Sequence, residues 1–230
     1  MKTLILNGSP KGARSDTLHL STAFARGMSD AADNEVEIIH IHEKHIEYCI
    51  GCFACKHNGG SCVLHDDMAE ILKKMLESDV LIFSFPLYSY AMPAAMKNLV
   101  DRTMPLSSWN MVRNEEGKYG HNMQFDVSKL HYVMICGCGF PNSKHNFEGA
   151  VRSFELKYPE RRTIITVPES PMFNIPQAND FTAPRIREME AAGREYASSF
   201  TLSEETLKTI CSPMIPEEIY DKFANGEIRR

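Results

Sequence analysis

Side chains that can bind an anion follow the first apolar segment of the chain. Residues 4–6 are Leu-Ile-Leu, and the loop after them carries hydroxyl and basic groups up to the start of a helical pattern. A strand, a small-residue loop and a helix start direct loop amides, hydroxyls and the unpaired N–H groups of the first helical turn to one point. The segment therefore predicts a phosphate-binding loop that contains Ser9, Lys11, Arg14, Ser15 and Thr17. The alternative is an ordinary strand-to-helix turn with a capping Ser or Asp.

The glycine spacing limits which phosphate-containing ligands the loop can bind. A nucleoside-triphosphate loop requires G-x-x-x-x-G-K-[ST], and neither Gly8 nor Gly12 leads into Lys-Ser or Lys-Thr. A dinucleotide fingerprint requires G-x-G-x-x-G, and Pro10 stands where the second glycine is needed. A hydroxyl-rich loop for a single terminal phosphate remains, and flavin mononucleotide (FMN) is its natural candidate.

Four of the seven cysteines form a compact cluster with the spacing C-x2-C-x2-C-x6-C, namely Cys49, Cys52, Cys55 and Cys62. Four thiolates are the ligand set of an iron–sulfur cluster. Zinc is a second interpretation, with His57 or His65 as substitute ligands, although zinc sites more often use two separated pairs. A loop of reduced, metal-free thiols is the third. The spacing permits each of the three.

Apolar segments of strand length alternate with helical patterns along the chain. The strand-like segments are residues 4–6, 36–41, 80–85, 132–136 and 164–167. Several are continuously apolar, which indicates burial on both faces of a sheet. We therefore predict an α/β fold, a flavodoxin-like doubly wound sheet of five parallel strands in the order 2-1-3-4-5 with helices on both faces. Ligands bind beyond the carboxyl ends of such strands, so the loops after strands one, three and four are expected to form one site.

Two segments fall outside this alternation, and residues 1–230 are otherwise expected to form a single domain. Residues 105–129 are too polar for a core and too long for an ordinary connection. We interpret them as a polar excursion, either a lid or a surface that packs on a second subunit to cover Trp109, the chain's only tryptophan. The C-terminal segment from about residue 203 is expected to dock one weak helix as an appendage.

Composition excludes several classes of function. A net charge of −5 provides no basic surface for a nucleic-acid partner, and no apolar run is long enough to span a membrane. The first apolar stretch is too short for a secretory signal, and seven cysteines, an odd number, favour thiols or metal ligands over a disulfide framework. We therefore expect a cytoplasmic protein.

The chain resembles the flavodoxin-like NADPH-dependent FMN reductases and their iron–sulfur flavoprotein relatives. Three stretches carry the resemblance, and they lie in the family's order within roughly the first hundred residues. The first consists of residues 7–10 and 15–17. The second runs from 49–52 through Cys62 to Asp66-Asp67-Met68, and the third runs from 86–88 through Pro93-Ala94. One departure is Asp16, where the family usually has Asn. Because an acid beside a phosphate is unfavourable, we expect Asp16 to cap the helix or point away, with Arg14 compensating its charge.

The resemblance implies the roles of individual residues. Ser9, Arg14, Ser15 and Thr17 would hold the FMN phosphate, with Lys11 adding charge. The flavin ring would lie against two further loops, which contribute Pro86, Leu87, Tyr88, Ser89, Gly137, Cys138 and Gly139. A [4Fe-4S] cluster would occupy the four clustered cysteines. The flavin carries the redox chemistry itself, so no side chain is assigned a catalytic role.

The resemblance implies an FMN-dependent oxidoreductase that uses NAD(P)H to reduce a small acceptor such as a quinone or nitro compound. One alternative is an iron–sulfur flavoprotein that passes single electrons between a [4Fe-4S] cluster and FMN. Another is a non-catalytic FMN-binding protein. An open ring face and the polar excursion both favour a subunit boundary near the flavin, so we expect a homo-oligomer, a dimer or tetramer, without a nucleic-acid or membrane partner.

Overall fold

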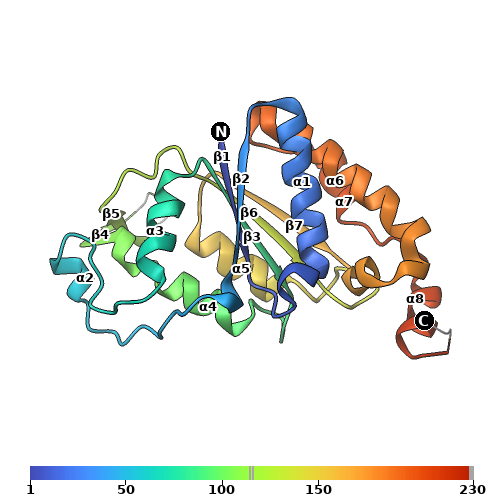
Figure 1. Ribbon diagram of the computed structural model, residues 1–230, viewed down its shortest axis with the longest axis horizontal. Coiled ribbons are helices and arrows are strands. Elements are labelled where there is room, and N and C mark those ends of the chain that lie inside the picture. The colour runs from blue at the N-terminus through green and yellow to red at the C-terminus, as the bar shows by residue number, and fades with distance from the viewer. Residues whose placement is uncertain (114, 116, 228–230) are drawn as a thin grey trace.

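One parallel sheet forms the centre of the protein in the computed structural model, which describes residues 1–113, 115 and 117–227 (Figure 1). Its strands lie in the order β2-β1-β3-β6-β7, so the predicted flavodoxin-like order is confirmed. Their bounds are β1 (Lys2–Asn7), β2 (Glu35–His40), β3 (Val80–Pro86), β6 (His131–Gly137) and β7 (Arg162–Val167). β1, β3 and β6 are buried along most of their length because helices cover both faces of the sheet.

The helices form two layers around the sheet. One layer consists of α1 (Asp16–Ala31) and α6 (Asn179–Ser199), which lie side by side (Figure 1). The other consists of α3 (Met68–Glu77), α4 (Ala94–Asp101) and α5 (Glu148–Lys157). Each helix presents one apolar face to the sheet, and this burial provides the main stabilisation of the fold. The predicted helical patterns correspond to these five helices.

Two glycines allow α1 and α6 to pack in backbone contact. A Cβ atom at Gly27 would lie 1.9 Å from the carbonyl oxygen of Glu190, and one at Gly193 would lie 1.9 Å from that of Phe24. No side chain fits at either position, because an approach this close to backbone requires the helices to separate. The contact holds α1 directly against α6.

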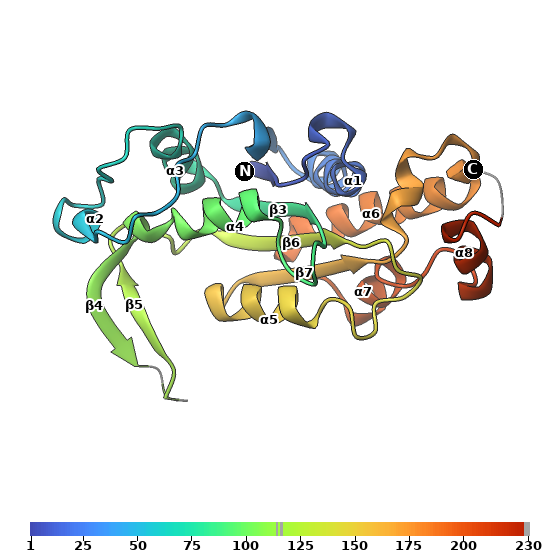
Figure 2. The same cartoon turned by 90° about the horizontal axis from the view of Figure 1, so that it is seen from below.

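The polar excursion folds as an antiparallel hairpin, which the sequence interpretation had not identified. Its strands are β4 (Ser107–Arg113) and β5 (Tyr119–Met123), and Figure 2 shows it projecting away from the sheet. Both strands are largely exposed, so the inside/outside alternation that marks a strand in sequence is missing. Residues 114 and 116 of this excursion lie outside the described residues.

The C-terminal segment contains two helices where one was expected. Ile210 of α7 (Glu204–Ile210) is buried in the core beneath α1 and α6, whereas Tyr220 of α8 (Glu217–Ala224) packs in a small separate cluster with Ile215. Residues 228–230 of the predicted appendage lie outside the described residues. The remaining helical segments are short: α2 (Ala54–His57) and the 3-10 turns Gly12–Arg14, Ile41–Glu43, Met104–Leu106, Ser170–Asn174 and Pro176–Ala178. Within the described chain, we find no helix with the length and apolarity needed to cross a membrane.

Candidate functional site

The loop between β1 and α1 gathers the predicted phosphate-binding hydroxyls. Ser9, Ser15 and Thr17 are almost completely buried, and Ser15 Oγ lies 3.0 Å from Thr17 Oγ1. Ser15 caps α1 by accepting the N–H of Leu18, and the other N–H groups of the first turn have no intrahelical acceptor. Ser9 Oγ accepts the N–H of Lys11 at 3.3 Å, which leaves its own O–H available as a donor. The loop can therefore present hydroxyl and amide donors to one anion.

Asn7 and Asn174 hold the phosphate loop in this shape, and the sequence interpretation assigned neither of them. Asn7, at the end of β1, donates to the carbonyl oxygen of Gly12 at 2.9 Å and accepts the N–H of Ser9. Asn174 donates to the carbonyl oxygen of Arg14 at 2.8 Å. The position of Asn7, a polar residue directly after the apolar run 4–6, was a local signal for the first contact. The second joins residues that are 160 positions apart, so no local pattern revealed it.

Asp16 is neutralised by Lys11, not by Arg14 as expected. Lys11 Nζ lies 2.5 Å from Asp16 Oδ2, and the amide of Asn174 donates to Asp16 Oδ1. The Arg14 side chain is exposed and is not among the partners of Asp16. The carboxylate is thus already partnered, which reduces its repulsion of an anion bound in the loop.

The loops after β1, β3 and β6 converge at the carboxyl edge of the sheet, as predicted. The N–H of Leu87 donates to the carbonyl oxygen of Gly137 at 2.7 Å. A Cβ atom at Gly137 would lie 2.6 Å from Ser170 Cβ and 2.8 Å from Thr17 Cγ2. Thr17 of the expected phosphate residues therefore meets Gly137, which in turn contacts Leu87, and both of these are expected ring-lining residues.

Aromatic side chains border this convergence. The loop after β3 turns through two residues in the left-handed region, Ser89 and Tyr90, and leaves Tyr88 half-exposed. The rings of Tyr90 and Phe140 lie nearly parallel, with an interplanar angle of 9° and centroids 6.2 Å apart. Pro86 ends β3 beside this turn. The arrangement provides flat apolar surface next to the exposed loop backbone, which suits a planar ring.

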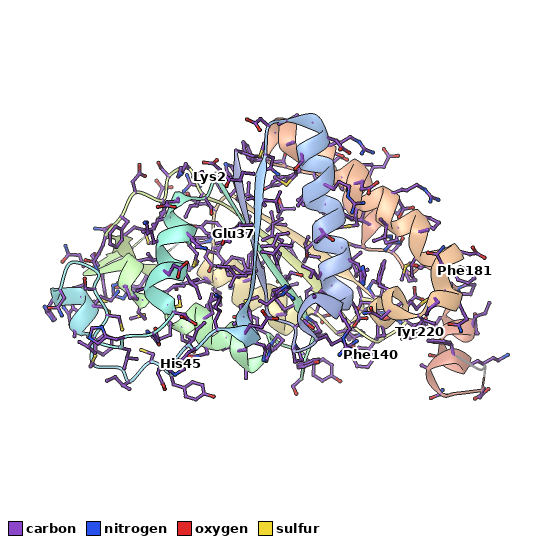
Figure 3. All side chains as sticks on the ribbon, in the orientation of Figure 1. Lys2, Glu37, His45, Phe140, Phe181 and Tyr220 are labelled. Atoms are coloured by element: carbon purple, nitrogen blue, oxygen red, sulfur yellow. The ribbon has the colours of Figure 1, made fainter. Side chains whose placement is uncertain are left out.

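The C-terminal half anchors the loop that contains Gly137, Cys138 and Gly139. Tyr220 donates its O–H to the carbonyl oxygen of Gly139 at 3.0 Å, and Figure 3 shows Tyr220 close to Phe140 of the same loop. The N–H of Glu169 donates to the carbonyl oxygen of Phe140, and the Glu169 carboxylate accepts the N–H groups of residues 214 and 215. Sequence analysis had placed Tyr220 only in the appendage and had not considered Glu169.

Burial sets the protonation of the groups behind this loop. It raises the pKa of the Cys138 thiol to about 11 and also raises the pKa of the Glu169 carboxyl. Cys138 is therefore a neutral thiol that packs and is not a reactive thiolate.

The four clustered cysteines line one small cavity between α2 and the 3-10 turn at Met104–Leu106. Cys55 is buried, Cys62 is half-buried, and Cys49 and Cys52 are exposed. Arg102 lines the same cavity and directs Nη2 toward Cys62 Sγ at 3.7 Å, whereas His57 and His65 are not among the lining residues. The other walls are mostly apolar, from Ile50, Phe53, Val63, Leu64, Met104 and Pro105.

The four thiols line the cavity but, among the described residues, do not form a site for a single metal ion. Three or more sulfur or nitrogen ligands of one zinc ion must all lie about 2.0–2.3 Å from it. Among the described residues, no group of three or more His, Cys, Asp or Glu side chains meets around one point in this way. In a four-iron cluster each thiolate binds its own iron, so the sulfurs are spread farther apart. The donor set of this cavity, four cysteine thiols, is the one that such a cluster takes.

A family comparison identifies this architecture. The family model described as NADPH-dependent FMN reductase matches residues 1–119, slightly more than half of the chain. The chain belongs to this FMN reductase family. The matched segment includes the phosphate loop, the cysteine loop and the loop after β3, but not the loop after β6 or the C-terminal anchors.

Similar proteins include flavoproteins and reductases. An iron-sulfur flavoprotein of Methanocaldococcus jannaschii is 37% identical over 117 residues, which cover 51% of this chain and 59% of that protein. This FMN reductase family member thus spans about three-fifths of the length of that curated relative. Two solved structures share the fold. They are an FMN-dependent NADH-azoreductase of Bacillus anthracis in complex with FMN (TM-score 0.62, 16% identity, 85% of this chain and 99% of that chain) and an NAD(P)H:quinone oxidoreductase of Methanothermobacter marburgensis (TM-score 0.60, 17% identity, 85% and 96%).

Proposed function

We propose that the protein is an FMN-dependent oxidoreductase that uses NAD(P)H to reduce a small acceptor such as a quinone or nitro compound. The observation that carries the proposal is the convergence of three loops: buried Thr17 lies against the end of β6 at Gly137, and Leu87 after β3 donates its N–H to the Gly137 carbonyl oxygen. The family assignment supports FMN as the ligand of these loops. The azoreductase and quinone oxidoreductase structures, which share only the fold, are consistent with redox use of such a site.

Each loop has a defined task in this proposal. Ser9, Ser15 and Thr17, together with the α1 N-terminus, would bind the phosphate, and Lys11 and Arg14 would add positive charge. Pro86, Leu87, Tyr88 and Ser89 would line the ring on one side, and Gly137, Cys138 and Gly139 would line it as well. FMN supplies both hydride and single-electron chemistry when bound. The protein's own contribution is to bind and orient the ring and to leave one face accessible to reductant and acceptor.

Removing the phosphate hydroxyls tests the proposal. Ser9→Ala/Thr17→Ala deletes two donors to the phosphate, each a hydrogen bond to a charged group and therefore about 1.5–3 kcal/mol. We expect FMN affinity to fall at least about tenfold per lost bond, with the fold retained. The matched control is Ser198→Ala/Thr209→Ala, which removes two exposed helix hydroxyls. FMN fluorescence quenching measures affinity, and anaerobic bleaching of the bound flavin by NADH or NADPH measures reduction.

The outcomes separate the candidate functions. Unchanged FMN affinity in the Ser9/Thr17 variant would show that the phosphate assignment is wrong. Tight FMN binding in the wild type without bleaching by either nucleotide would favour the non-catalytic FMN-binding protein instead.

The cysteine cavity supports a second candidate, an iron–sulfur flavoprotein with a [4Fe-4S] cluster held by Cys49, Cys52, Cys55 and Cys62. The observation that favours this candidate is that all four thiols and Arg102 line one cavity with mostly apolar walls. The relatives named iron-sulfur flavoproteins support the same candidate. A bound cluster would supply single-electron transfer. Iron and acid-labile sulfide analysis distinguishes the candidates, because about four irons per chain are expected only with the cluster.

We also propose that the protein is a homo-oligomer, with a subunit boundary at the β4–β5 hairpin. A two-stranded hairpin is marginally stable in water, and this one exposes Trp109, Met111 and Tyr119. The molar mass of the protein, measured by light scattering as it elutes from a size-exclusion column, tests the oligomeric state. A monomer at micromolar concentration would contradict the proposal.

A further inference from the structure

A buried ion pair lies directly behind the cysteine cavity. Arg102, which follows α4, and Asp66, which precedes α3, have side chains that are 2% and 0% exposed. Arg102 Nη1 lies 2.6 Å from Asp66 Oδ2 and Nη2 lies 3.0 Å from Oδ1, so the contact is bidentate. Burying two charges carries a large desolvation cost, and an apolar pair of similar volume is often equally stable. Stability alone therefore does not account for this pair.

The pair joins the two ends of the segment that carries all four cysteines. Glu47 lies just before Cys49, and its N–H donates to Asp66 Oδ2 at 2.9 Å. The carbonyl oxygen of Glu47 accepts Arg102 Nη1 at 2.6 Å. Asp66 follows Cys62 and also accepts the N–H of Met68 at 3.1 Å. One ion pair thus closes residues 47–66 into a loop and ties that loop to the start of α3 and the end of α4.

The same guanidinium contacts the cysteine sulfur. Arg102 Nη2 lies 3.7 Å from Cys62 Sγ, and Arg102 shares the cavity with all four thiols. Lys56, the cation next to Cys55 in sequence, points elsewhere, because its ammonium donates to the carbonyl oxygens of Met104 and Ser107. Hydrogen bonds to cluster sulfurs and nearby positive charge favour the more negative, reduced form of an iron–sulfur cluster and so raise its reduction potential.

We propose that the Arg102–Asp66 pair is the positioning element of the cysteine site, closing the 47–66 loop and donating to the Cys62 sulfur of a bound cluster. The proposal rests on the second candidate function above. Neither residue is a cluster ligand. Arg102 acts through Cys62 and Glu47, and Asp66 holds Arg102 in place.

Two variants and a matched control test it. Arg102→Lys keeps the charge but loses the planar fork. Arg102→Met/Asp66→Asn removes both charges, so that no unpaired ion stays buried. Lys97→Met is the control, because it breaks a surface ion pair with Asp101 on the same helix. Each protein is supplied anaerobically with ferrous iron and sulfide, and bound FMN is measured in the same samples to verify the fold.

The readouts are iron and sulfide per chain, the rate of iron loss to a chelator, and the cluster's midpoint potential. We expect both Arg102 variants to lose iron about 10-fold or more faster than wild type, and Arg102→Lys to have a lower midpoint potential, while Lys97→Met matches wild type. Wild-type protein that binds no iron and sulfide would overturn the cluster and this proposal together. If the wild type binds iron and sulfide and both Arg102 variants match it in iron loss and midpoint potential, this proposal alone would be overturned.

A metal-free readout tests the loop closure separately. Lys56 is buried within the 47–66 loop and is a trypsin site. We expect trypsin to cut after Lys56 several-fold faster in the paired Arg102/Asp66 variant than in Lys97→Met. Equal cleavage rates in the two variants would overturn the closing role of the pair.

Discussion

Gly137 is the position where a single added methyl group most directly tests the geometry of the proposed flavin site. It ends β6, and a Cβ atom there would lie 2.6 Å from both Cβ and Oγ of Ser170 and 2.8 Å from Thr17 Cγ2. These atoms belong to short side chains near the backbone, so they cannot rotate away freely. Gly137→Ala must therefore push the end of β6 away from the α1 N-terminus. The matched control is Gly139→Ala, whose Cβ would meet Pro171 Cγ at an ordinary 3.5 Å.

The expected magnitude follows from the cost of overpacking. Inserting a methyl group into a filled space costs about 1–3 kcal/mol, and three contacts below 3 Å place Gly137→Ala toward the upper end. If about half of this strain is relieved by moving Thr17 out of the phosphate loop, FMN binding loses about 1.4 kcal/mol, a tenfold rise in Kd. The Gly139 control should change stability by no more than about 0.5 kcal/mol.

Urea unfolding of the FMN-free protein and fluorescence titration with FMN measure the two effects separately. We expect Gly137→Ala to be less stable and to bind FMN about tenfold more weakly, whereas Gly139→Ala should keep the stability of the wild type. Loss of stability with unchanged FMN affinity would refute the placement of the phosphate beside Thr17. Unchanged stability would refute the close packing of the loops after β1 and β6.

Three further predictions concern groups outside the family-matched segment. Gly193→Ala should destabilise the protein by about 3 kcal/mol or more in urea unfolding, because its Cβ would lie 1.9 Å from backbone; a loss below about 1 kcal/mol would contradict the backbone contact. Tyr220→Phe removes the donor to Gly139 and should cost about 0.5–1.5 kcal/mol, with faster FMN release in stopped-flow dilution; an unchanged release rate would argue against the anchor. Burial raises the pKa of Glu169, so its contribution to stability is full below its ordinary value of 4.5 and is lost as pH rises through the raised value. Glu169→Gln should therefore gain stability relative to wild type as pH increases from about 4.5 to 7 in urea unfolding, and a constant difference would contradict this.

The sheet and its main helices could be predicted because their signals are local. Continuous apolar runs, helical periods and the residues of the phosphate loop each depend on neighbouring positions, and β1, β3 and β6 formed where those runs lie. The alternation of elements and the handedness of their crossovers indicated a doubly wound sheet, and the order came from the flavodoxin-like sheet that five strands suggested. The predicted convergence of the loops after strands one, three and four followed from that order alone.

The features that sequence analysis missed depend on contacts between distant segments or on exposed strands. The β4–β5 hairpin has both faces exposed, so it lacks the two-residue alternation of a half-buried strand. The contacts from Asn174 to Arg14 and from Tyr220 to Gly139 join positions 160 and 81 residues apart. The partner of Asp16 was assigned wrongly because Arg14 is the nearer cation in sequence. The 3-10 turn at Gly12–Arg14 instead lets Lys11, five residues away, reach the carboxylate.

Both halves of the chain contribute residues to the candidate site, and their contributions differ. Residues 1–119, which match the family, provide the phosphate loop, the loop after β3 and the cysteine loop. The C-terminal half provides the groups that hold these loops in place: Asn174 on Arg14 and Asp16, and Tyr220 on Gly139. The amide of Asn174 and the ammonium of Lys11 both donate to the Asp16 carboxylate, which offsets its repulsion of an anion in the neighbouring loop. A charge in the first half of the chain is thus compensated partly from the second, so the proposed phosphate site depends on residues outside the segment that matches the family.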